Sequence, residues 1–291
     1  MACFSSFVIV FCSVSLAGSA STDRALLSSS TRTADESRDR TPGGPLVICG
    51  GGALPDEIFT RLRELTEQTA PTLVVIPTAS QRADDESYER RLIDTWKQRG
   101  FGQVDVLHTR DRTTAESPQF AQPLRTADVV WFGGGSQSRI VDAYLSTKFE
   151  KAIYDFHERG GVIGGTSAGA AIMSRVMIAS GNPVPNVRTG FDLLPNAVID
   201  QHFLRRKRQP RLRAVIRQHP QLTGFGIDEG TAMIVRGQLA EVMGDSTVTI
   251  FRRLDGNKAL TAEAWEPGTT VRLEGSAAAA TSENPSSPRS Q

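Results

Sequence analysis

The chain has 291 residues, of which 39% are hydrophobic and 22% are charged, and its formal net charge is +1. These values are typical of a globular protein with one large or two small domains. The near-zero net charge argues against a generally basic nucleic-acid-binding protein. The function therefore has to be sought in local motifs.

The first 20 residues resemble a secretory signal. An apolar run begins at residue 7, continues in small and apolar residues to Ala17, and ends before a small-residue cleavage site at Gly18, Ser19 and Ala20. The run is too short for a stable membrane span, which takes about 20 residues. We therefore expect a signal peptide at 1–20 and a secreted or periplasmic protein. No Lys or Arg precedes the run, which leaves a cytoplasmic protein as the alternative.

Two further segments lack a sustained apolar pattern. Residues 21–44 are rich in Ser, Thr, Arg and Asp, and residues 275–291 are rich in Ala, Ser and Pro. Such compositions are typical of disordered chain. We therefore predict a linker at 21–44, one folded domain at 45–274 and a disordered tail at 275–291. Cleavage of the signal would leave Cys49 as the only cysteine, and its place in an apolar run predicts a buried thiol.

Short, continuous apolar runs alternate with amphipathic segments in the first part of the domain. This pattern is typical of an α/β fold with a mainly parallel sheet and helices on both faces. After about Gly224, closely spaced runs separated by glycine predict antiparallel strands that extend the same sheet. The predicted strands are 46–49, 72–76, 104–107, 128–132, 162–164, 197–199, 225–227, 232–235, 240–242 and 247–251, and the first two predicted helices are 56–69 and 84–98.

The stretch 161–171 places Ser167 between Gly165 and Gly169, where an apolar run gives way to small residues. A strand that turns abruptly into a helix strains the turn residue, and glycines two positions away on each side leave room for the close approach. The hydroxyl is then exposed at a helix N-terminus, where N–H groups can stabilise an oxyanion. We predict that Ser167 is a nucleophile; the alternative is a helix N-cap in a glycine-rich turn.

A serine nucleophile needs a base within hydrogen-bond reach, and a carboxylate usually orients that base. Of the four histidines, His157 and His219 fit cations near helix C-termini, and His108 closes a predicted strand. His202 differs because it lies among polar residues at the end of an apolar run, where sites form in such sheets. We therefore expect His202 to be the base.

The orienting carboxylate has three candidates. Asp228 and Glu229 follow the predicted strand 225–227, and they point to opposite sides if the strand continues, so only one can face the site. Asp200 is a weaker candidate and is equally suited to binding substrate. Spacing alone does not choose among them.

Two glycine triplets follow predicted strands. Glycine lets the backbone approach a ligand and direct its N–H groups at it, so Gly134 or Gly135 together with Ala168 would form an oxyanion hole; the alternative is a tight turn without chemistry. The triplet at 50–52 does not fit a dinucleotide-binding motif, because Pro55 stands where that motif has its third glycine.

The densest positive charge lies at 205–213, where Pro210 suits the first turn of a helix. Guanidinium groups bind carboxylates bidentately, and the nearness of His202 favours a substrate site over a solvated basic face. The small net charge and the lack of interleaved aromatic residues argue against nucleic acid. The arginines placed on the loop entering this helix are Arg206, Arg208 and Arg211.

Together these motifs resemble the cyanophycinase family, serine peptidases of the peptidase E (S51) group with a class I glutamine amidotransferase-like fold. The resemblance spans roughly residues 46–251 and depends on the segments 134–137, 165–170, 200–211 and 226–231. It implies that Ser167 is the nucleophile, His202 the base and Glu229 the orienting acid, a choice that spacing left open. It further implies a substrate pocket lined by Gln137, Asp200, Gln201, Arg206, Arg208 and Arg211.

The resemblance implies a serine-type exopeptidase that hydrolyses cyanophycin, a polyaspartate with arginine on each β-carboxyl, to β-Asp-Arg dipeptides through an acyl-enzyme. It implies no metal or organic cofactor, and it implies a homodimer. Amidotransferases of this fold have a cysteine at the position of Ser167, which argues against glutamine hydrolysis. The alternatives are a peptidase E-like aspartyl dipeptidase and a non-catalytic binding protein on the same fold.

Overall fold

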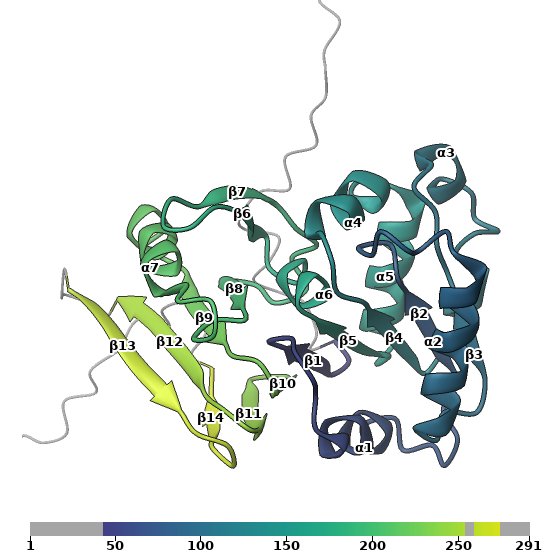
Figure 1. Cartoon of the computed structure of the whole chain (residues 1–291), viewed down its shortest axis with the longest axis horizontal. Helices are drawn as coiled ribbons and strands as arrows, with labels where there is room; N and C mark the ends of the chain where they lie inside the picture. Colours follow the sequence, from purple (N-terminus) through teal and green to yellow (C-terminus); the bar gives the residue numbers. More distant parts are fainter. Residues whose placement is uncertain (1–42, 254–258, 274–291) are drawn as a thin grey trace, which may run out of the picture. The chain divides into compact units, whose positions relative to one another are not determined.

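The computed structural model describes residues 43–253 and 259–273. Within these ranges the chain forms three β-sheets and the helices that pack on them (Figure 1). The predicted signal, the predicted tail and residues 21–42 of the predicted linker lie outside the described residues. Gly44, the last residue assigned to the linker, is bound to the domain because its N–H donates to the His157 carbonyl at 2.7 Å.

The elements of the first half, in chain order, are β1 (Leu46–Cys49), α1 (Asp56–Glu64), β2 (Leu73–Ile76), α2 (Glu86–Gln98), β3 (Val104–Val106), α3 (Arg112–Ala115), the 3-10 helix η1 (Gln122–Arg125), β4 (Val129–Phe132), α4 (Gln137–Tyr144), α5 (Lys148–Glu158), β5 (Val162–Thr166) and α6 (Ala168–Ala171). Those of the second half are β6 (Val176–Ser180), β7 (Asn186–Thr189), β8 (Ala197–Gln201), α7 (Gln209–Gln218), β9 (Thr223–Ile227), β10 (Thr231–Arg236), β11 (Leu239–Gly244), β12 (Val248–Arg253), β13 (Leu260–Trp265) and β14 (Thr270–Arg272).

Two helices are shorter than predicted, and local hydrogen bonds explain both differences. Helix α1 ends at Glu64 rather than at residue 69, because the Thr66 hydroxyl donates to the Arg63 carbonyl at 2.7 Å and Glu67 adopts a φ of 58°. Helix α2 begins after Asp85, whose carboxylate caps it by accepting the Ser87 N–H at 2.8 Å. Both helix ends thus follow ordinary capping chemistry.

In the described chain the largest sheet has the strand order β14-β11-β10-β1-β5-β4-β2-β3. Strands β1, β5, β4, β2 and β3 are parallel to their neighbours in this group. Strands β10, β11 and β14 extend the sheet beside β1 in antiparallel pairs. The prediction of a mainly parallel sheet with antiparallel strands from the C-terminal part is confirmed.

Helices cover both faces of this sheet, as predicted. Along β1, Leu46 and Ile48 belong to an apolar cluster that includes side chains of α4, α5 and α6. Val47 and Cys49 point to the other face and pack in a second cluster with side chains of α1 and α2. The alternation follows from the two-residue period of a strand, and it leaves the Cys49 thiol buried.

The prediction that all the later strands extend the same sheet is wrong for β9 and β12. They form a second sheet with the order β13-β12-β9-β8, in which β8 and β9 are parallel (Figure 1). Helix α7 packs on this sheet through Leu212, Val215 and Ile216. An apolar run predicts a strand but does not specify which strand it pairs with. The division of the later strands between two sheets could therefore not be predicted from the sequence.

The chain passes from the second sheet to the first in the turn 228–230, between β9 and β10. The Gly230 N–H donates to the Gly51 carbonyl at 2.9 Å, which attaches this turn to the loop after β1. A third, two-stranded sheet is the hairpin β6–β7. Predicted site residues follow the carboxyl ends of β4, β5, β8 and β9, and the carboxyl end of β1 lies beside those of β5 and β8, because its last residue and the next accept the N–H groups of Ser167 and His202.

Candidate active site

Ser167 forms a strained turn between β5 and α6, with φ 54° and ψ −108°. Residues with side chains rarely adopt positive φ. A Cβ on Gly165 would lie 2.5 Å from the Gly169 carbonyl oxygen, and a Cβ on Gly169 would lie 2.1 Å from that of Phe132. Both glycines are therefore needed, as expected. The Ser167 side chain makes no capping hydrogen bond at α6 within the described structure, which disfavours the N-cap alternative.

Ser167, His202 and Glu229 are joined by two hydrogen bonds. Ser167 Oγ lies 2.9 Å from His202 Nε2, and His202 Nδ1 lies 2.5 Å from Glu229 Oε1. A carboxylate can only accept, so Nδ1–H donates to Glu229 and Nε2 is left to accept the serine proton. The structure brings together the three residues that the resemblance implied, although they come from the ends of three different strands.

His202 is held in its neutral form mainly by burial. Only 8% of the residue is exposed, and this burial lowers its pKa below the ordinary value. Glu229 raises the pKa, whereas the positive charges of Arg206 and Arg208 lower it. The balance favours the neutral imidazole, the form that can accept a proton from serine.

The glycine triplet at 50–52 packs against His202 and Glu229. The His202 N–H donates to the Gly50 carbonyl at 2.7 Å. A Cβ on Gly51 would lie 2.4 Å from His202 Cε1, and one on Gly52 would lie 2.9 Å from Glu229 Cβ. The sequence analysis excluded a dinucleotide site here but missed this role. The available signal was the position of three glycines at the carboxyl end of the first strand.

Asp228 and Glu229 point to opposite sides, so only Glu229 contacts His202. The Asp228 Oδ1 atom instead accepts the backbone N–H groups of Leu204 and Arg205, each at 3.0 Å. The structure thereby makes the choice that spacing had left open. It also shows that the second carboxylate has partners of its own.

Two of the residues predicted to form an oxyanion hole, Gly134 and Ala168, lie next to Ser167, and Gly135 lines the same pocket. A Cβ on Gly134 would lie 3.6 Å from Ser167 Cβ. Gly135 has a φ of 139°, and a Cβ there would lie 2.2 Å from the Ala79 carbonyl oxygen. Ala168 is the buried first residue of α6. This arrangement is compatible with N–H donors near the nucleophile, and the oxyanion role stays a prediction.

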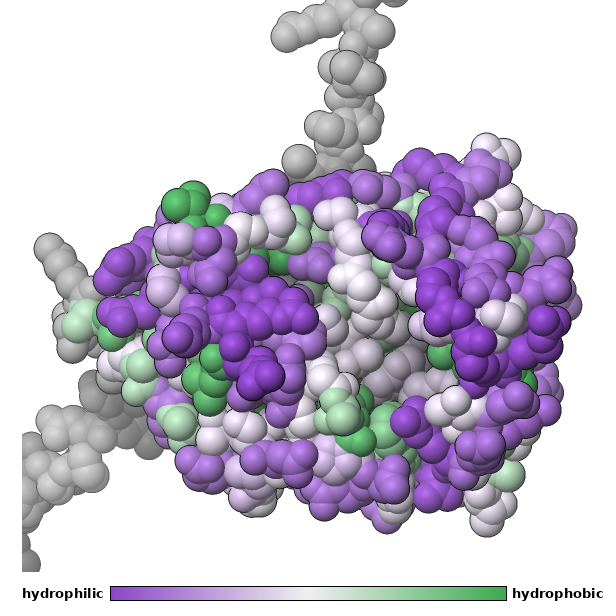
Figure 2. Space-filling view, viewed as in Figure 1, coloured by the Kyte–Doolittle hydropathy of each residue, from purple (hydrophilic) through white to green (hydrophobic). Residues whose placement is uncertain are grey.

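A pocket of about 460 Å³ opens beside Ser167. Figure 2 shows that this face of the domain is hollowed next to a strongly hydrophilic area. The lining includes five of the six predicted substrate-binding residues, while Asp200 is buried behind it. The lining residues are Gly135, Gln137, Ser167, Ala179, Ser180, Gly181, Asn182, Gln201, Arg206, Arg208 and Arg211.

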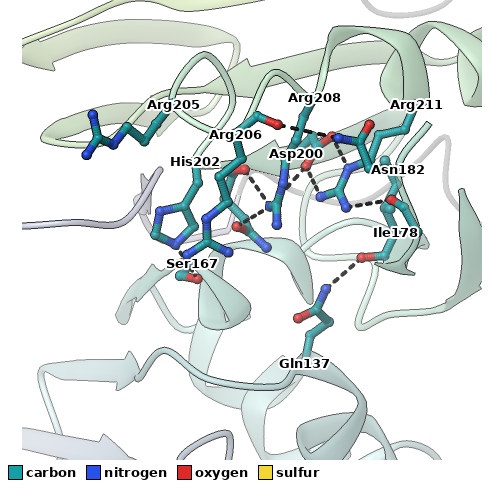
Figure 3. Close-up of polar contacts among 12 residues, drawn as sticks. Gln137, Ser167, Ile178, Asn182, Asp200, His202, Arg205, Arg206, Arg208 and Arg211 are labelled. Atoms are coloured by element: carbon teal, nitrogen blue, oxygen red, sulfur yellow. Dashed lines mark hydrogen bonds and ion pairs between the residues drawn. The ribbon is translucent and has the colours of Figure 1, made fainter.

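Arg211 and Arg208 are held in place by other side chains of the site (Figure 3). Arg211 binds Asp200 bidentately, with Nε 2.8 Å from Oδ2 and a second contact to Oδ1. One terminal nitrogen of Arg208 donates to Gln201 Oε1 at 2.6 Å. Burial raises the pKa of Asp200, an effect that the arginines oppose. Burial, followed by the charge of Arg211, lowers the pKa of Arg208 to about 10, so Arg208 stays cationic at neutral pH.

Arg206 is different because its guanidinium has no hydrogen bond or ion pair in the described chain, and the residue is exposed. Figure 3 shows its side chain running beside His202 toward Ser167, whereas Arg205 points away from the pocket. Arg206 is therefore a cation that is available to an incoming carboxylate next to Ser167.

The β6–β7 hairpin forms part of the pocket wall, which the sequence analysis did not foresee. Gln137 Nε2 donates to the carbonyls of Ile178 and Ala179 at 2.7 and 3.0 Å. Arg211 donates to the Gly181 carbonyl at 2.9 Å from the other side. The only local signal was a polar turn with Gly and Pro after an apolar run, which does not reveal where a hairpin packs.

In the described ranges, no three His, Cys, Asp or Glu side chains are grouped to hold a metal ion. No helix of the described chain is both long and apolar enough to cross a membrane.

The comparisons with known proteins agree with this geometry. The model of peptidase family S51 matches residues 46–243. A cyanophycinase of Geminocystis herdmanii is 32% identical over 203 residues, which are 67% of this chain and 74% of the relative. A cyanophycinase of Thermosynechococcus vestitus is 36% identical over 218 residues, or 70% of this chain and 67% of the relative.

More distant relatives share the fold. A peptidase E of Pasteurella multocida is 24% identical over 198 residues, which are 64% of this chain and 81% of the relative. The crystal structure of a peptidase from an acI-B1 actinobacterium superposes with a TM-score of 0.61 at 26% identity, covering 80% of this chain and 98% of that one. The chain therefore belongs to peptidase family S51 and is a serine peptidase.

Proposed function

We propose that the chain is a cyanophycinase-like exopeptidase that hydrolyses cyanophycin (multi-L-arginyl-poly-L-aspartate) to β-Asp-Arg dipeptides. The observation that carries the proposal is the chain of contacts from Glu229 through His202 to Ser167, beside a pocket lined by arginine side chains. The relatives named as cyanophycinases support the choice of polymer.

The pocket suits the two kinds of charge in each cyanophycin unit. Arg206 would pair with the free carboxylate of the substrate, because no other side chain of the described chain neutralises it. The amide nitrogen of Gln137 is already bound to the β6 carbonyls, so its oxygen is left to accept from the substrate guanidinium. In Figure 3 this oxygen faces the cavity. Asp200 and Gln201 hold the other two arginines in position.

The proposed reaction has two stages. Ser167 Oγ forms a bond to the scissile carbonyl carbon while its proton passes to His202 Nε2, and the N–H groups of Gly134 or Gly135 and Ala168 bind the oxyanion. Collapse breaks the C–N bond, and His202 returns the proton to the departing amine. Water then gives a proton to His202 Nε2 as its oxygen bonds to the acyl carbon, the C–O bond to Ser167 breaks, and His202 returns the proton to Ser167 Oγ. Glu229 keeps the imidazole oriented and stabilises its cationic form.

The test is release of soluble β-Asp-Arg from purified cyanophycin, measured by mass spectrometry. We expect release by the unaltered protein and by Ser117→Ala, which removes an exposed hydroxyl that bonds only to Gln119 in the described structure. We expect none from Ser167→Ala. Release that persists in Ser167→Ala would contradict the assigned nucleophile.

The second candidate is an aspartyl dipeptidase, which the similarity to peptidase E supports. Both enzymes would need the same nucleophile and base, so the substrate has to separate them. Hydrolysis of α-Asp dipeptides without release of β-Asp-Arg from the polymer would favour the dipeptidase. Activity on cyanophycin alone would exclude it.

A further inference from the structure

Asp228 joins three segments of the chain through one carboxylate. Its Oδ1 accepts the N–H groups of Leu204 and Arg205, both at 3.0 Å. Its Oδ2 accepts the hydroxyl of Ser246 at 3.2 Å, from the turn between β11 and β12. Because Glu229 alone serves His202, the function proposed above does not account for these contacts.

The segment held by Asp228 is the basic loop, which we define as residues 203–208. The loop is a tight turn, in which the Arg206 N–H donates to the His202 carbonyl at 3.0 Å and the Arg208 N–H to that of Phe203 at 2.9 Å. Lys207 has a φ of 51°. The four consecutive cations at 205–208 repel one another, and a carboxylate that accepts two backbone N–H groups opposes the opening of such a loop.

The anchoring affects the three pocket arginines unequally. Arg208 is tied to Gln201, and Arg211 is tied to Asp200, so side-chain contacts hold both groups. Arg206 has no such contact within the described residues, and its position therefore depends on the backbone of the basic loop alone. We propose that Asp228 is a positioning residue that fixes the basic loop and thereby holds Arg206 over the pocket beside Ser167.

The proposal depends on the proposed function only in taking Ser167 as the nucleophile and Arg206 as the cation that meets the substrate carboxylate. Loosening the loop would weaken substrate binding more than the chemical step, because His202 has its own anchors in Gly50 and Glu229. It would also change the surroundings of His202. The charged groups that act on His202 are Glu229, which raises its pKa, and Arg206 and Arg208, which lower it.

The experiment is a double-mutant cycle of Asp228→Ala and Arg206→Gln. It is read out as kcat and KM for soluble cyanophycin fragments and as the pH dependence of Ser167 labelling by a fluorophosphonate. We expect Asp228→Ala to raise KM by about fivefold or more with a smaller change in kcat, the scale of one lost anchoring contact. We also expect the acid limb of the pH profile of Ser167 labelling to move to higher pH in this variant, because a displaced Arg206 no longer lowers the pKa of His202. Arg206→Gln should produce the same changes, and the double variant should add little.

Two variants separate positioning from general stability. Asp228→Asn keeps an oxygen that accepts the same N–H groups, so it should restore KM and the pH profile to near those of the unaltered enzyme. Asp111→Ala removes a carboxylate that likewise accepts two N–H groups, those of Thr113 and Thr114 at 3.0 and 3.1 Å, but caps α3 away from the site. It should leave KM and the pH profile unchanged.

Additive effects in the cycle, or a folded Asp228→Ala variant with unchanged KM and acid limb, would overturn the proposal. If Asp228→Ala does not fold, Ser246→Ala is the alternative, because it removes the hydroxyl that binds the other oxygen of Asp228 and so loosens the same carboxylate. It should shift KM and the acid limb in the same direction, and no shift would refute the idea. Failure of the proposed function is distinguishable, because the unaltered enzyme would then release no dipeptide from cyanophycin. The pH dependence of Ser167 labelling would still report the effect of Asp228→Ala.

Discussion

At the scale of single residues, the proposed nucleophile and the proposed base both have strained backbone conformations. Ser167 has a φ of 54° and His202 a φ of 47°, and such conformations cost roughly 1–3 kcal/mol each. Both residues are closely packed by glycines at which a Cβ would clash. These are Gly165 and Gly169 around the serine and Gly51 next to the histidine ring. With these backbone conformations, Ser167 Oγ and His202 Nε2 lie 2.9 Å apart.

The pH profile of the enzyme should report on His202. Because burial lowers its pKa, we expect kcat/KM to fall with decreasing pH only below the ordinary histidine value of about 6.5. The sign follows from the mechanism, since only the neutral imidazole accepts the serine proton. Replacement of Glu229 by Gln removes a group that raises this pKa, so the acid limb of the kcat/KM profile should move to still lower pH. The same replacement should lower kcat by about 10²- to 10⁴-fold. A limb that moved upward in Glu229→Gln would contradict the assigned contact.

At the scale of elements, the loops at the carboxyl ends of the strands do more than connect them. The loop after β1 carries the glycines beneath His202, and the loop after β4 places Gly134 against Ser167. The turn after β9 places the carboxylate of Glu229 against the His202 imidazole and that of Asp228 against the basic loop. Sites of doubly wound sheets form where such loops meet.

Gly51→Ala should damage catalysis more than folding. Its Cβ would lie 2.4 Å from the imidazole, so the ring has to move and kcat should fall by at least about tenfold, in line with the cost of small misplacements of reacting groups. Gly268→Ala is the matched control, because Gly268 also has a positive φ, of 85°, but a Cβ there meets nothing within 4 Å. Steady-state kinetics and thermal melts of both variants measure the two effects. Equal kcat values in the two variants would show that the close approach is unimportant.

The Cys49 thiol at the end of β1 should be inert in the folded protein. The residue is fully buried between the sheet and helices α1 and α2, and burial raises the pKa of the thiol well above its usual range. A thiolate is the reactive form, so alkylation should be slow until the protein unfolds. Peptide mapping after maleimide treatment, with and without denaturant, measures this. Rapid labelling under native conditions would refute the burial.

At the scale of the whole molecule, the domain combines a main sheet with a second sheet that carries the proposed base. Ser167 follows β5 of the main sheet, whereas His202 and Glu229 follow β8 and β9 of the second. The hydrogen bonds of Ser167 and of Gly50 to His202 therefore join the two sheets. Activity thus depends on how the sheets pack as well as on each residue.

We also propose export of the protein, from the apolar run and the small-residue cleavage site before residue 21. N-terminal sequencing of the protein purified from cells should find a chain that begins at Ser21. A protein whose N-terminus is still Met1 would contradict export by this route and favour the cytoplasmic alternative.

Much of the architecture was predictable because it depends on local patterns. Continuous apolar runs indicated the parallel strands, and the glycines at 165 and 169 indicated the turn at Ser167. The pairing of β9 and β12 in a separate sheet was not predictable, because an apolar run fits several neighbours equally well. The β6–β7 hairpin at the pocket was missed for the same reason.

The sequence by itself determined the parallel α/β fold, the strained serine and the basic segment near His202, since each depends on residue types at fixed spacing. The resemblance implied that Glu229 meets the imidazole, but only the tertiary structure showed that contact, and it alone showed that Asp228 binds the basic loop. It alone showed Arg206 as the pocket arginine without a partner in the described chain. These outcomes depend on contacts between residues far apart in the chain, which are set by the packing of two sheets rather than by local pattern.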